Sequence, residues 1–123
     1  MVSSNPEVVG SGLPRAYQRP CVLILLGEGS AHGYDLLEQL RGIGLISVDA
    51  GGLYRSLRSM EEDGLVSSRW EPSPAGPPRR SYELSEKGQL ALASAVRDLT
   101  EVRDLLSRLV ERFHASPRTA TEP

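Results

Sequence analysis

The 123 residues suffice for one small domain with an extension, but not for two hydrophobic cores. The formal net charge at pH 7 is −2, so the chain is not basic overall and any contact with nucleic acid must come from a local patch. The only cysteine, Cys21, excludes an internal disulfide and a cysteine-rich metal site.

The longest apolar run, residues 21–26, is much too short to cross a bilayer. The first fifteen residues also lack the basic start and apolar stretch of a targeting signal. We therefore expect a cytoplasmic protein with no membrane partner. Because Cys21 lies in the apolar run, we expect a buried inert thiol rather than a redox sensor, a choice that the sequence leaves open.

Residues 1–14 contain Ser, Asn, Pro and Gly without apolar periodicity, which predicts a flexible tail, with docking on a partner subunit as the alternative. Pro20 fits the first turn of a helix that is apolar nearly all round and should be central to the core. Glycines 27 and 29 end this helix, and no Gly-Lys-Ser/Thr follows them, so they do not form a phosphate loop. Ser30 can cap a second helix with apolar positions at Leu36, Leu37 and Leu40.

Residues 49–64 predict a third helix. Asp49 is a good N-cap because its carboxylate can accept a hydrogen bond from a first-turn amide, and Gly64 suits the residue after the last turn. Leu53, Leu57 and Met60 recur at helical spacing and should face a core. The second helix, a short connector and this helix form the helix-turn-helix arrangement, in which the later helix enters the major groove of DNA.

The opposite face of the third helix carries Arg55 and Arg58 after two glycines, Gly51 and Gly52. Glycines let the backbone at a helix start approach a phosphate closely, and arginine can fork onto guanine or clamp phosphate. The alternative is an ordinary solvated face, since the acidic residues 61–63 partly cancel the charge. The helix-turn-helix context favours the first interpretation, a DNA-binding face.

Two strand-like runs, residues 65–70 and 81–84, flank a linker of residues 71–80. Its prolines and glycine predict a stiff exposed hairpin loop rather than a tight two-residue turn. Arg79 and Arg80, where the linker rejoins the second strand, are well placed to hold phosphates or reach the minor groove. A solvated loop with arginines for solubility is the alternative.

Ser85 can cap a last helix over residues 86–114, which would be about 43 Å long at 1.5 Å per residue. Apolar side chains follow a heptad seam along it: Leu92, Val96, Leu99, Val102, Leu106, Leu109, Val110 and Phe113. Such a seam favours a homodimer, while the alternative, packing back on its own domain, is expected of the first two turns. Residues 115–123 predict a disordered tail.

The predicted fold class is therefore mainly α with a small two-stranded antiparallel sheet: a winged helix-turn-helix followed by a long C-terminal dimerisation helix. The predicted domains are a flexible tail over residues 1–14, a DNA-binding domain over residues 15–85, a dimerisation helix over residues 86–114 and a disordered tail over residues 115–123.

Several spaced motifs resemble one known family, the PadR family of bacterial transcriptional regulators, over roughly residues 13–113. The resemblance implies a winged helix-turn-helix, a homodimer through the C-terminal helix, and usually repression at an inverted-repeat operator. The short C-terminal helix resembles the smaller of the family's two size classes. The motifs are Ile24-Leu-Leu-Gly-Glu-Gly-Ser-Ala-His-Gly-Tyr-Asp-Leu, Gly52-Leu-Tyr-Arg-Ser-Leu, Glu61-Glu-Asp-Gly-Leu-Val and Pro78-Arg-Arg-Ser-Tyr-Glu-Leu-Ser-Glu-Lys-Gly.

The resemblance also assigns roles to single positions. It places Leu53 and Tyr54 in the recognition helix, His32, Gly33 and Tyr34 at the start of the buttressing helix, and Arg79, Arg80 and Tyr82 in the wing. The complete set of expected DNA contacts is Gly51, Gly52, Tyr54, Arg55, Arg58, Arg79 and Arg80. For Tyr54 we expect a mixed role, with its hydroxyl on phosphate and its ring against the second helix. Trp70 and Tyr82 are expected to be packing residues, and His32 a structural histidine.

Two departures from the family pattern matter. The chain has Asp49-Ala-Gly-Gly where the family commonly has Ser-Pro-Gly-Thr, so the threonine's phosphate contact cannot be assumed. Ser85 replaces a threonine and should still cap the last helix.

The leading hypothesis is thus a homodimeric transcriptional repressor that binds double-stranded DNA and needs no cofactor or metal. Whether a small-molecule effector relieves the repression is left open. The alternative is a ligand- or protein-binding winged-helix module without operator binding, which Asp49, the glycines in place of the family's threonine and the acidic residues 61–63 motivate. An enzyme is not expected, because no nucleophile elbow, metal cluster or catalytic carboxylate pair occurs.

Overall fold

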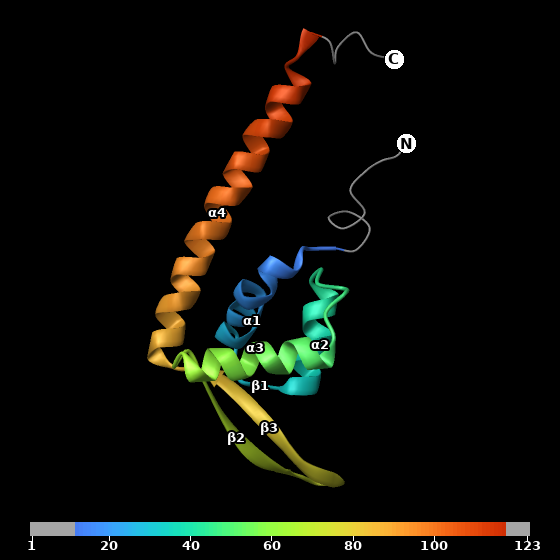
Figure 1. Cartoon of the computed structure of the whole chain (residues 1–123), viewed down its shortest axis with the longest axis vertical. Helices are drawn as coiled ribbons and strands as arrows, with labels where there is room; N and C mark the ends of the chain where they lie inside the picture. The colour runs from blue at the N-terminus through green and yellow to red at the C-terminus, as the bar shows by residue number, and fades with distance from the viewer. Residues whose placement is uncertain (1–11, 118–123) are drawn as a thin grey trace. The chain divides into compact units, whose positions relative to one another are not determined.

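The computed structural model describes residues 12–117, and Figure 1 shows its elements. The chain divides into two compact units, the first ending at Leu92 and the second beginning at Ala93. In chain order the elements are η1 (Arg15–Tyr17), α1 (Gln18–Gly27), β1 (Ala31–His32), α2 (Gly33–Gly42), α3 (Ala50–Glu62), β2 (Val66–Ser73), β3 (Gly76–Leu84) and α4 (Glu86–His114).

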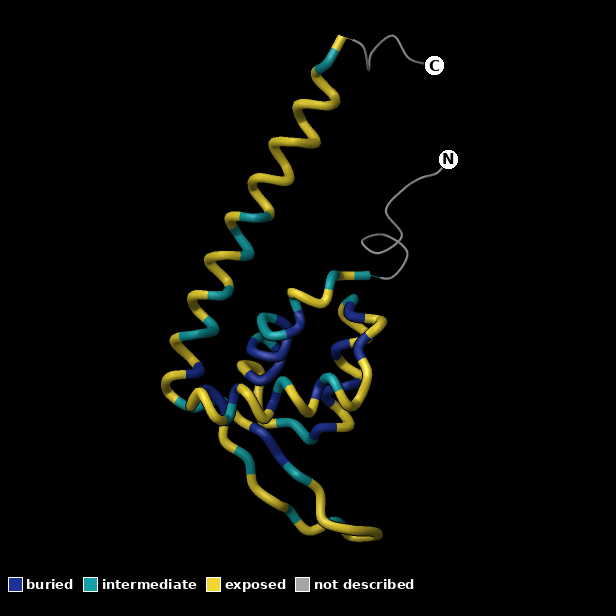
Figure 2. The backbone as a smooth tube through the Cα atoms, viewed as in Figure 1, coloured by how far each residue is buried: buried dark blue, intermediate teal, exposed yellow. Residues whose placement is uncertain are grey.

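The core of the first unit lies between α1, α2 and α3, whose facing sides are dark blue in Figure 2. As predicted, α1 is apolar nearly all round and contributes most of its length to this core. The apolar stripe of α3 is also confirmed, because all three of its residues are fully buried. The largest fully buried side chains are Val22, Leu36, Leu40, Leu45, Leu53, Leu57 and Met60.

Both ends of α3 are fixed as the sequence predicts. An Asp49 Oδ1 atom accepts a hydrogen bond of 2.7 Å from the Gly52 amide. Gly64 has a positive φ of 79°, and its amide donates to the Glu61 carbonyl oxygen while the Leu65 amide donates to that of Met60. These two bonds satisfy carbonyls that would otherwise be free at the helix end, in the manner of a Schellman motif.

The sheet has three antiparallel strands in the order β1-β3-β2, one strand more than predicted. The additional strand is only two residues long: Ala31 lies opposite Tyr82, and His32 lies opposite Ser81. Pairing of residues 31 and 32 with β3 delays α2 until Gly33. The prediction that Ser30 caps α2 is therefore wrong. The N-cap residue is His32, whose side chain makes no capping hydrogen bond.

The hairpin of β2 and β3, called the wing below, corrects the predicted long loop. The strands continue through Pro72, Pro77 and Pro78, and Ser73 lies opposite Gly76, so that Pro74 and Ala75 form a tight two-residue turn. The strand register shifts between Glu71 and Ser73, which sets Pro72 against residues 77–78. A bulge of this kind tolerates prolines, because the missing amides fall where no ladder hydrogen bond is required.

The long last helix is confirmed as a single helix from Glu86 to His114. Ser85 caps it, since its Oγ accepts a hydrogen bond of 3.0 Å from the Gly88 amide and donates one of 2.6 Å to the Gly64 carbonyl. Gly88 is buried against the carbonyl oxygen of Leu65, where a side chain would not fit. The first turns of α4 therefore pack within the first unit, as predicted.

Part of the predicted N-terminal tail is held in place. The Leu13 amide donates a hydrogen bond of 2.7 Å to the carbonyl oxygen of Gly44 in the connector before α3. Residues 1–11 of that tail, and residues 118–123 of the predicted C-terminal tail, lie outside the described residues. Within residues 12–117, no helix has both the length and the apolar character that a membrane span requires.

Candidate nucleic-acid interface

The recognition-helix candidate, α3, has one outward face and two flanks. The outward face carries exposed residues: Gly51, Arg55 and Glu62. The flank toward the wing carries Tyr54, Arg58 and Glu61. The flank toward α1 carries Gly52, Ser56 and Ser59. Helical spacing produces this division, because Leu53, Leu57 and Met60 occupy the remaining side.

Tyr54 lies against the start of α2. A Cβ atom added to Gly33 would be 2.6 Å from the Tyr54 hydroxyl oxygen and 2.7 Å from its ring, so only glycine allows this close approach. Tyr54 nevertheless remains 41% exposed. Packing on α2, one half of the mixed role expected for Tyr54, is thus visible, and a phosphate contact stays a prediction.

Arg80 is held between the wing and α3. Its Nε donates a hydrogen bond of 3.0 Å to Ser68 Oγ, and its guanidinium carbon lies 5.1 Å from the centre of the Trp70 ring. A further nitrogen lies 3.9 Å from a carboxylate oxygen of Glu61 on α3. Register explains this cluster, because Trp70 pairs with Arg80 across the wing. The arginine predicted to contact DNA therefore also connects the wing to α3.

A groove of about 600 Å³ runs between α3 and the wing and is called the wing groove below. Tyr82, 5% exposed at its base, is a packing residue as predicted, and burial raises the pKa of its hydroxyl. Trp70 is 64% exposed and packs on the surface of the wing, against the guanidinium of Arg80. The lining residues are His32, Gly33, Tyr34, Tyr54, Arg58, Glu61, Trp70, Pro78, Arg79, Arg80 and Tyr82.

His32 fastens the wing to the strand before α2. Its Nε2–H donates a hydrogen bond of 2.9 Å to Glu71 Oε1, which confirms a structural role for this histidine. Arg69 donates to the other carboxylate oxygen of Glu71 at 3.2 Å. The bond from His32 and then that from Arg69 hold the pKa of Glu71 below its usual value. Sequence reasoning missed Glu71, because 39 residues separate it from His32.

The α1 side of α3 contains two links that sequence reasoning also missed. The Gln18 amide nitrogen donates to Ser56 Oγ at 2.7 Å and to the Gly52 carbonyl at 3.3 Å. Arg19 donates to Ser59 Oγ and to the Asp63 carboxylate, both at 3.2 Å. The available signal in the sequence was a pair of polar residues, Gln18 and Arg19, at the start of a helix that is otherwise apolar. These bonds fix α3 against α1 from its first turn to its last.

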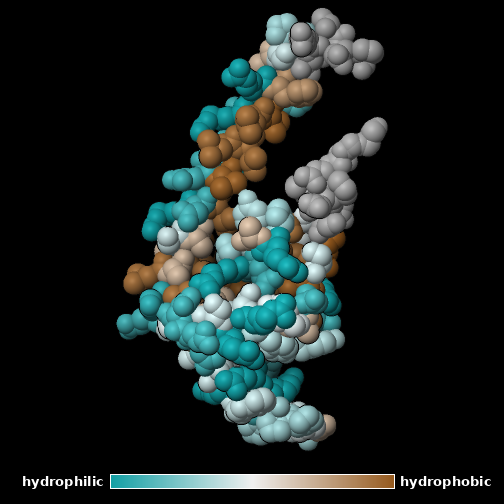
Figure 3. Space-filling model, in the orientation of Figure 1, coloured by the Kyte–Doolittle hydropathy of each residue, from teal (hydrophilic) through white to brown (hydrophobic). Residues whose placement is uncertain are grey.

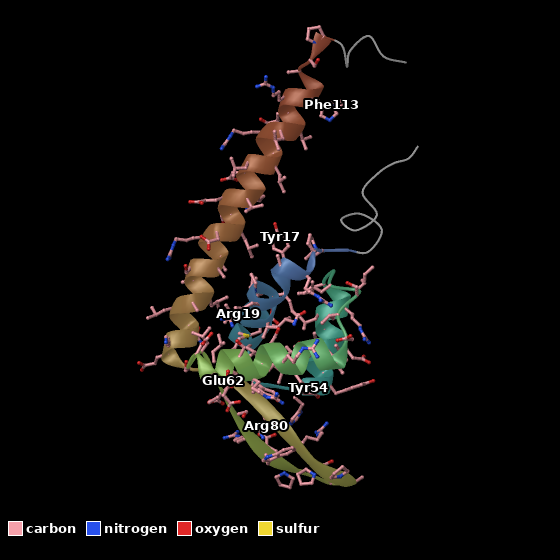
Figure 4. All side chains as sticks on the ribbon, in the orientation of Figure 1. Tyr17, Arg19, Tyr54, Glu62, Arg80 and Phe113 are labelled. Carbon is pink, nitrogen blue, oxygen red and sulfur yellow. The ribbon has the colours of Figure 1, made fainter. Side chains whose placement is uncertain are left out.

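The acidic end of α3 is largely neutralised within the first unit. Glu61 accepts a hydrogen bond of 2.9 Å from Ser68 and lies near Arg80. Asp63 forms its ion pair with Arg19. Of the three acids in this run, only Glu62, labelled in Figure 4, has no ion-pair partner among residues 12–117. Glu61 and Asp63 are therefore engaged by Arg80 and Arg19, and neither acid forms an ion pair with Arg55 or Arg58 of α3.

The heptad seam of α4 is only partly covered within the chain. Leu92, the first residue of the seam, packs beside Gly27 within the first unit. The later seam residues are exposed, by 55% at Leu106 and 63% at Leu109. Figure 3 shows apolar side chains gathered along this part of α4. The exposed apolar residues of the second unit are Val96, Leu105, Leu106, Leu109, Val110 and Phe113.

Of the predicted DNA contacts, Tyr54, Arg58, Arg79 and Arg80 line the wing groove, whereas Gly52 and Arg55 border the α1 side of α3. Gly51, Gly52, Tyr54, Arg55 and Arg58 lie on α3, and Arg79 and Arg80 lie on the adjoining strand of the wing. All except Gly52 and Arg80, which are half-buried, are exposed. Among the described residues, no group of three His, Cys, Asp or Glu side chains could hold a metal ion.

Comparison with known proteins identifies this arrangement. Residues 22–94 match the model of the family described as "Transcriptional regulator PadR-like family". The chain is 30% identical to a PadR-like transcription factor from Bacteroides fragilis, over 76% of this chain and 90% of that one, with a TM-score of 0.64. No curated protein matches the chain.

Two other solved structures share the fold at lower identity. A PadR-like transcriptional regulator from Bacillus cereus is 24% identical, with a TM-score of 0.72 over 78% of this chain and 93% of that one. Bacillus subtilis PadR, solved in complex with operator DNA, is 21% identical, with a TM-score of 0.57 over 63% of this chain and 45% of that one.

Proposed function

Since the chain belongs to the PadR-like family of transcriptional regulators, we propose that it is a homodimeric DNA-binding repressor. It acts at an inverted-repeat operator. The observation that carries the proposal is the groove in which Arg58 of α3 lies beside Arg79 and Arg80 of the wing, with Arg55 exposed on the neighbouring outward face of α3. The structure of Bacillus subtilis PadR in complex with operator DNA supports double-stranded DNA as the proposed partner of this chain.

In this proposal α3 enters the major groove. A helix with its side chains is about 10–12 Å across, which matches a groove about 12 Å wide. Arg55, on the outward face, and Arg58, on the wing flank, contact bases or phosphates. The wing arginines hold the neighbouring backbone. Gly51 and Gly52 allow the first turn of α3 to approach a phosphate. The Tyr54 hydroxyl donates a hydrogen bond to another phosphate.

The domain roles follow from the same proposal. Residues 15–85 bind DNA, and residues 86–114 form the dimerisation helix. The exposed seam residues of α4 support this, because five large apolar side chains along one helix, with Leu105 beside them, are a surface that association would cover. A twofold dimer places two copies of α3 on two half-sites, which explains an inverted-repeat operator.

Binding to upstream DNA of the chain's own gene tests the function. We expect tighter binding to that DNA than to a scrambled duplex of equal length. Replacement of Arg55 or Arg58 by Ala should cost about 1–3 kcal/mol if that side chain forks onto guanine, and should reduce the preference. Arg97→Ala, which removes the same charge from α4, serves as the control. Equal binding of all variants to both duplexes would contradict the proposal.

Association is tested separately. A Leu106→Glu/Leu109→Glu variant should sediment as a monomer and bind a full operator much more weakly, because each Glu would enter the apolar interface. An Arg108→Glu variant, changed between the two positions, is the matched control and should remain a dimer. If the double variant remained a dimer, the interface would have to lie elsewhere than at Leu106 and Leu109.

Two observations favour operator binding over the alternative, a winged-helix module without it. Two of the three acids that motivated the alternative are paired within the first unit, and Asp49 serves as the cap of α3. Relief by a small-molecule effector remains part of the proposal. Its test is release of bound DNA in a screen of soluble compounds.

A further inference from the structure

We propose that a second groove, between α1 and α3, binds the DNA strand that passes on the side of α3 opposite the wing. Arg15 and Arg55 are its cationic contacts. The inference rests on the proposed function and extends the DNA contacts to the η1–α1 segment, which carries none of the residues predicted from the sequence. The ligand chemistry is a phosphodiester of the DNA backbone.

The groove measures about 370 Å³ and is called the α1 groove below. It is lined by three arginines, Arg15, Arg19 and Arg55, and no carboxylate occurs among its described lining residues. The wing groove, by contrast, includes Glu61. The α1 groove is therefore the more uniformly cationic of the two surfaces that flank α3.

The arginines of the α1 groove differ in their freedom. Arg19 is held by Asp63 and Ser59, so its charge is partly used within the protein. Arg15 and Arg55 form no ion pair with any residue in the described part of the chain, and both are exposed. We therefore assign the phosphate contacts to Arg15 and Arg55, with Arg19 as a positioning residue.

Two serine hydroxyls are available as additional donors. Ser56 Oγ accepts a hydrogen bond from Gln18, and Ser59 Oγ accepts one from Arg19. A hydroxyl that accepts from its own protein still has one O–H to donate. Since the neighbouring groups are donors, these O–H groups can be directed toward a phosphate oxygen in the groove.

The geometry of the major groove explains why such a site is needed. A helix that fills the groove has one sugar–phosphate strand on each side. On one side of α3 lie the wing and Arg80, and on the other lies α1 with Arg19, as Figure 4 shows. The arginines of the wing can reach only the nearer strand. The α1 groove supplies the cations for the other one.

An Arg15→Ala variant of the full chain tests this inference in a salt series. Each phosphate contact contributes about 0.9 to the log–log salt slope on duplex DNA. Loss of Arg15 should therefore reduce that slope by about 0.9 and weaken binding to operator and scrambled DNA by the same factor. Arg97→Ala is the charge-matched control, and circular dichroism verifies folding.

The outcomes separate the two proposals. If the wild-type chain binds the operator steeply with salt but Arg15→Ala has the same slope, the α1-groove site is overturned and the proposed function stands. If the wild-type chain shows no salt-dependent binding, the proposed function fails together with this site. If inorganic phosphate binds the wild-type chain but not Arg15→Ala, while both proteins bind DNA with the same affinity and salt slope, the groove is a site for free phosphate, which also overturns the inference.

Discussion

Gly33 and Tyr54 are in direct contact: a Cβ atom at position 33 would lie 2.6 Å from the Tyr54 hydroxyl oxygen. This contact seats the first turn of α2 against the wing-facing flank of α3. It joins the two helices of the helix-turn-helix at the edge of the wing groove. The position of a proposed DNA contact thus depends on a missing side chain in the neighbouring helix.

A Gly33→Ala substitution should destabilise the protein by about 1–3 kcal/mol, because the new methyl group displaces the tyrosine ring. In a Tyr54→Ala background the same change should cost much less, since the space is free and Ala favours a helix by about 1 kcal/mol over Gly. Urea unfolding of the four proteins gives the coupling. An equal cost in both backgrounds would show that the contact has no energetic role.

Loss of the Asp49 cap should also be measurable. Asp49→Ala removes the acceptor for the Gly52 amide and should cost about 1 kcal/mol of stability. Asp49→Ser retains a capping oxygen and should restore most of this loss. Thermal unfolding of the three proteins is the measurement. If Asp49→Ser is as unstable as Asp49→Ala, the carboxylate acts through its charge rather than as a cap.

The three-dimensional arrangement was predictable where the signal is local. The limits and apolar face of α3 follow from Asp49, Gly64 and the spacing of Leu53, Leu57 and Met60, and the structure confirms them. The wing turn was not predictable in this way. Prolines usually mark loops, and only the pairing of Glu71 with Arg79 and of Ser73 with Gly76 reveals that here they lie in strands around a bulge.

The pH dependence of stability should report on the bond between His32 and Glu71. The folded-state pKa of Glu71 lies below its usual value of 4.5, so its carboxylate stabilises the fold above that pH. The contribution is lost as pH falls through the lowered pKa. The melting temperature should therefore fall less steeply on acidification below about pH 4.5 in Glu71→Gln than in the wild type.

Asp35, whose carboxylate lies 3.7 Å from His32 Nδ1, also faces this histidine and is retained in both proteins. Glu83→Gln, on the neighbouring strand, is the control and should follow the wild-type curve. Identical acid profiles for the wild type and Glu71→Gln would rule out a stabilising role for the bond.

Cys21 should be unreactive in the native protein. It is 7% exposed, and burial raises the pKa of its thiol, so little of the reactive thiolate forms at neutral pH. An aromatic disulfide reagent should label it slowly in buffer and completely in denaturant. Rapid labelling of the folded chain would instead favour the redox-sensor interpretation.

The candidate site was predictable in composition but not in its connections. Arg55 and Arg58 could be placed on one side of α3 from helical spacing alone. By contrast, the links of Gln18 to Ser56 and of Arg19 to Asp63 join residues 38 and 44 positions apart. No periodic pattern encodes such pairs, because they depend on how α1 and α3 meet in the folded unit.

The most direct test of the central claim is the number of protomers bound per duplex of upstream DNA, measured by sedimentation across a salt series. The account predicts two protomers per site and a steep salt slope, both lost in an Arg55→Ala/Arg58→Ala variant that remains folded and dimeric. Weak binding that is equal on scrambled DNA and unchanged in the double variant would contradict it.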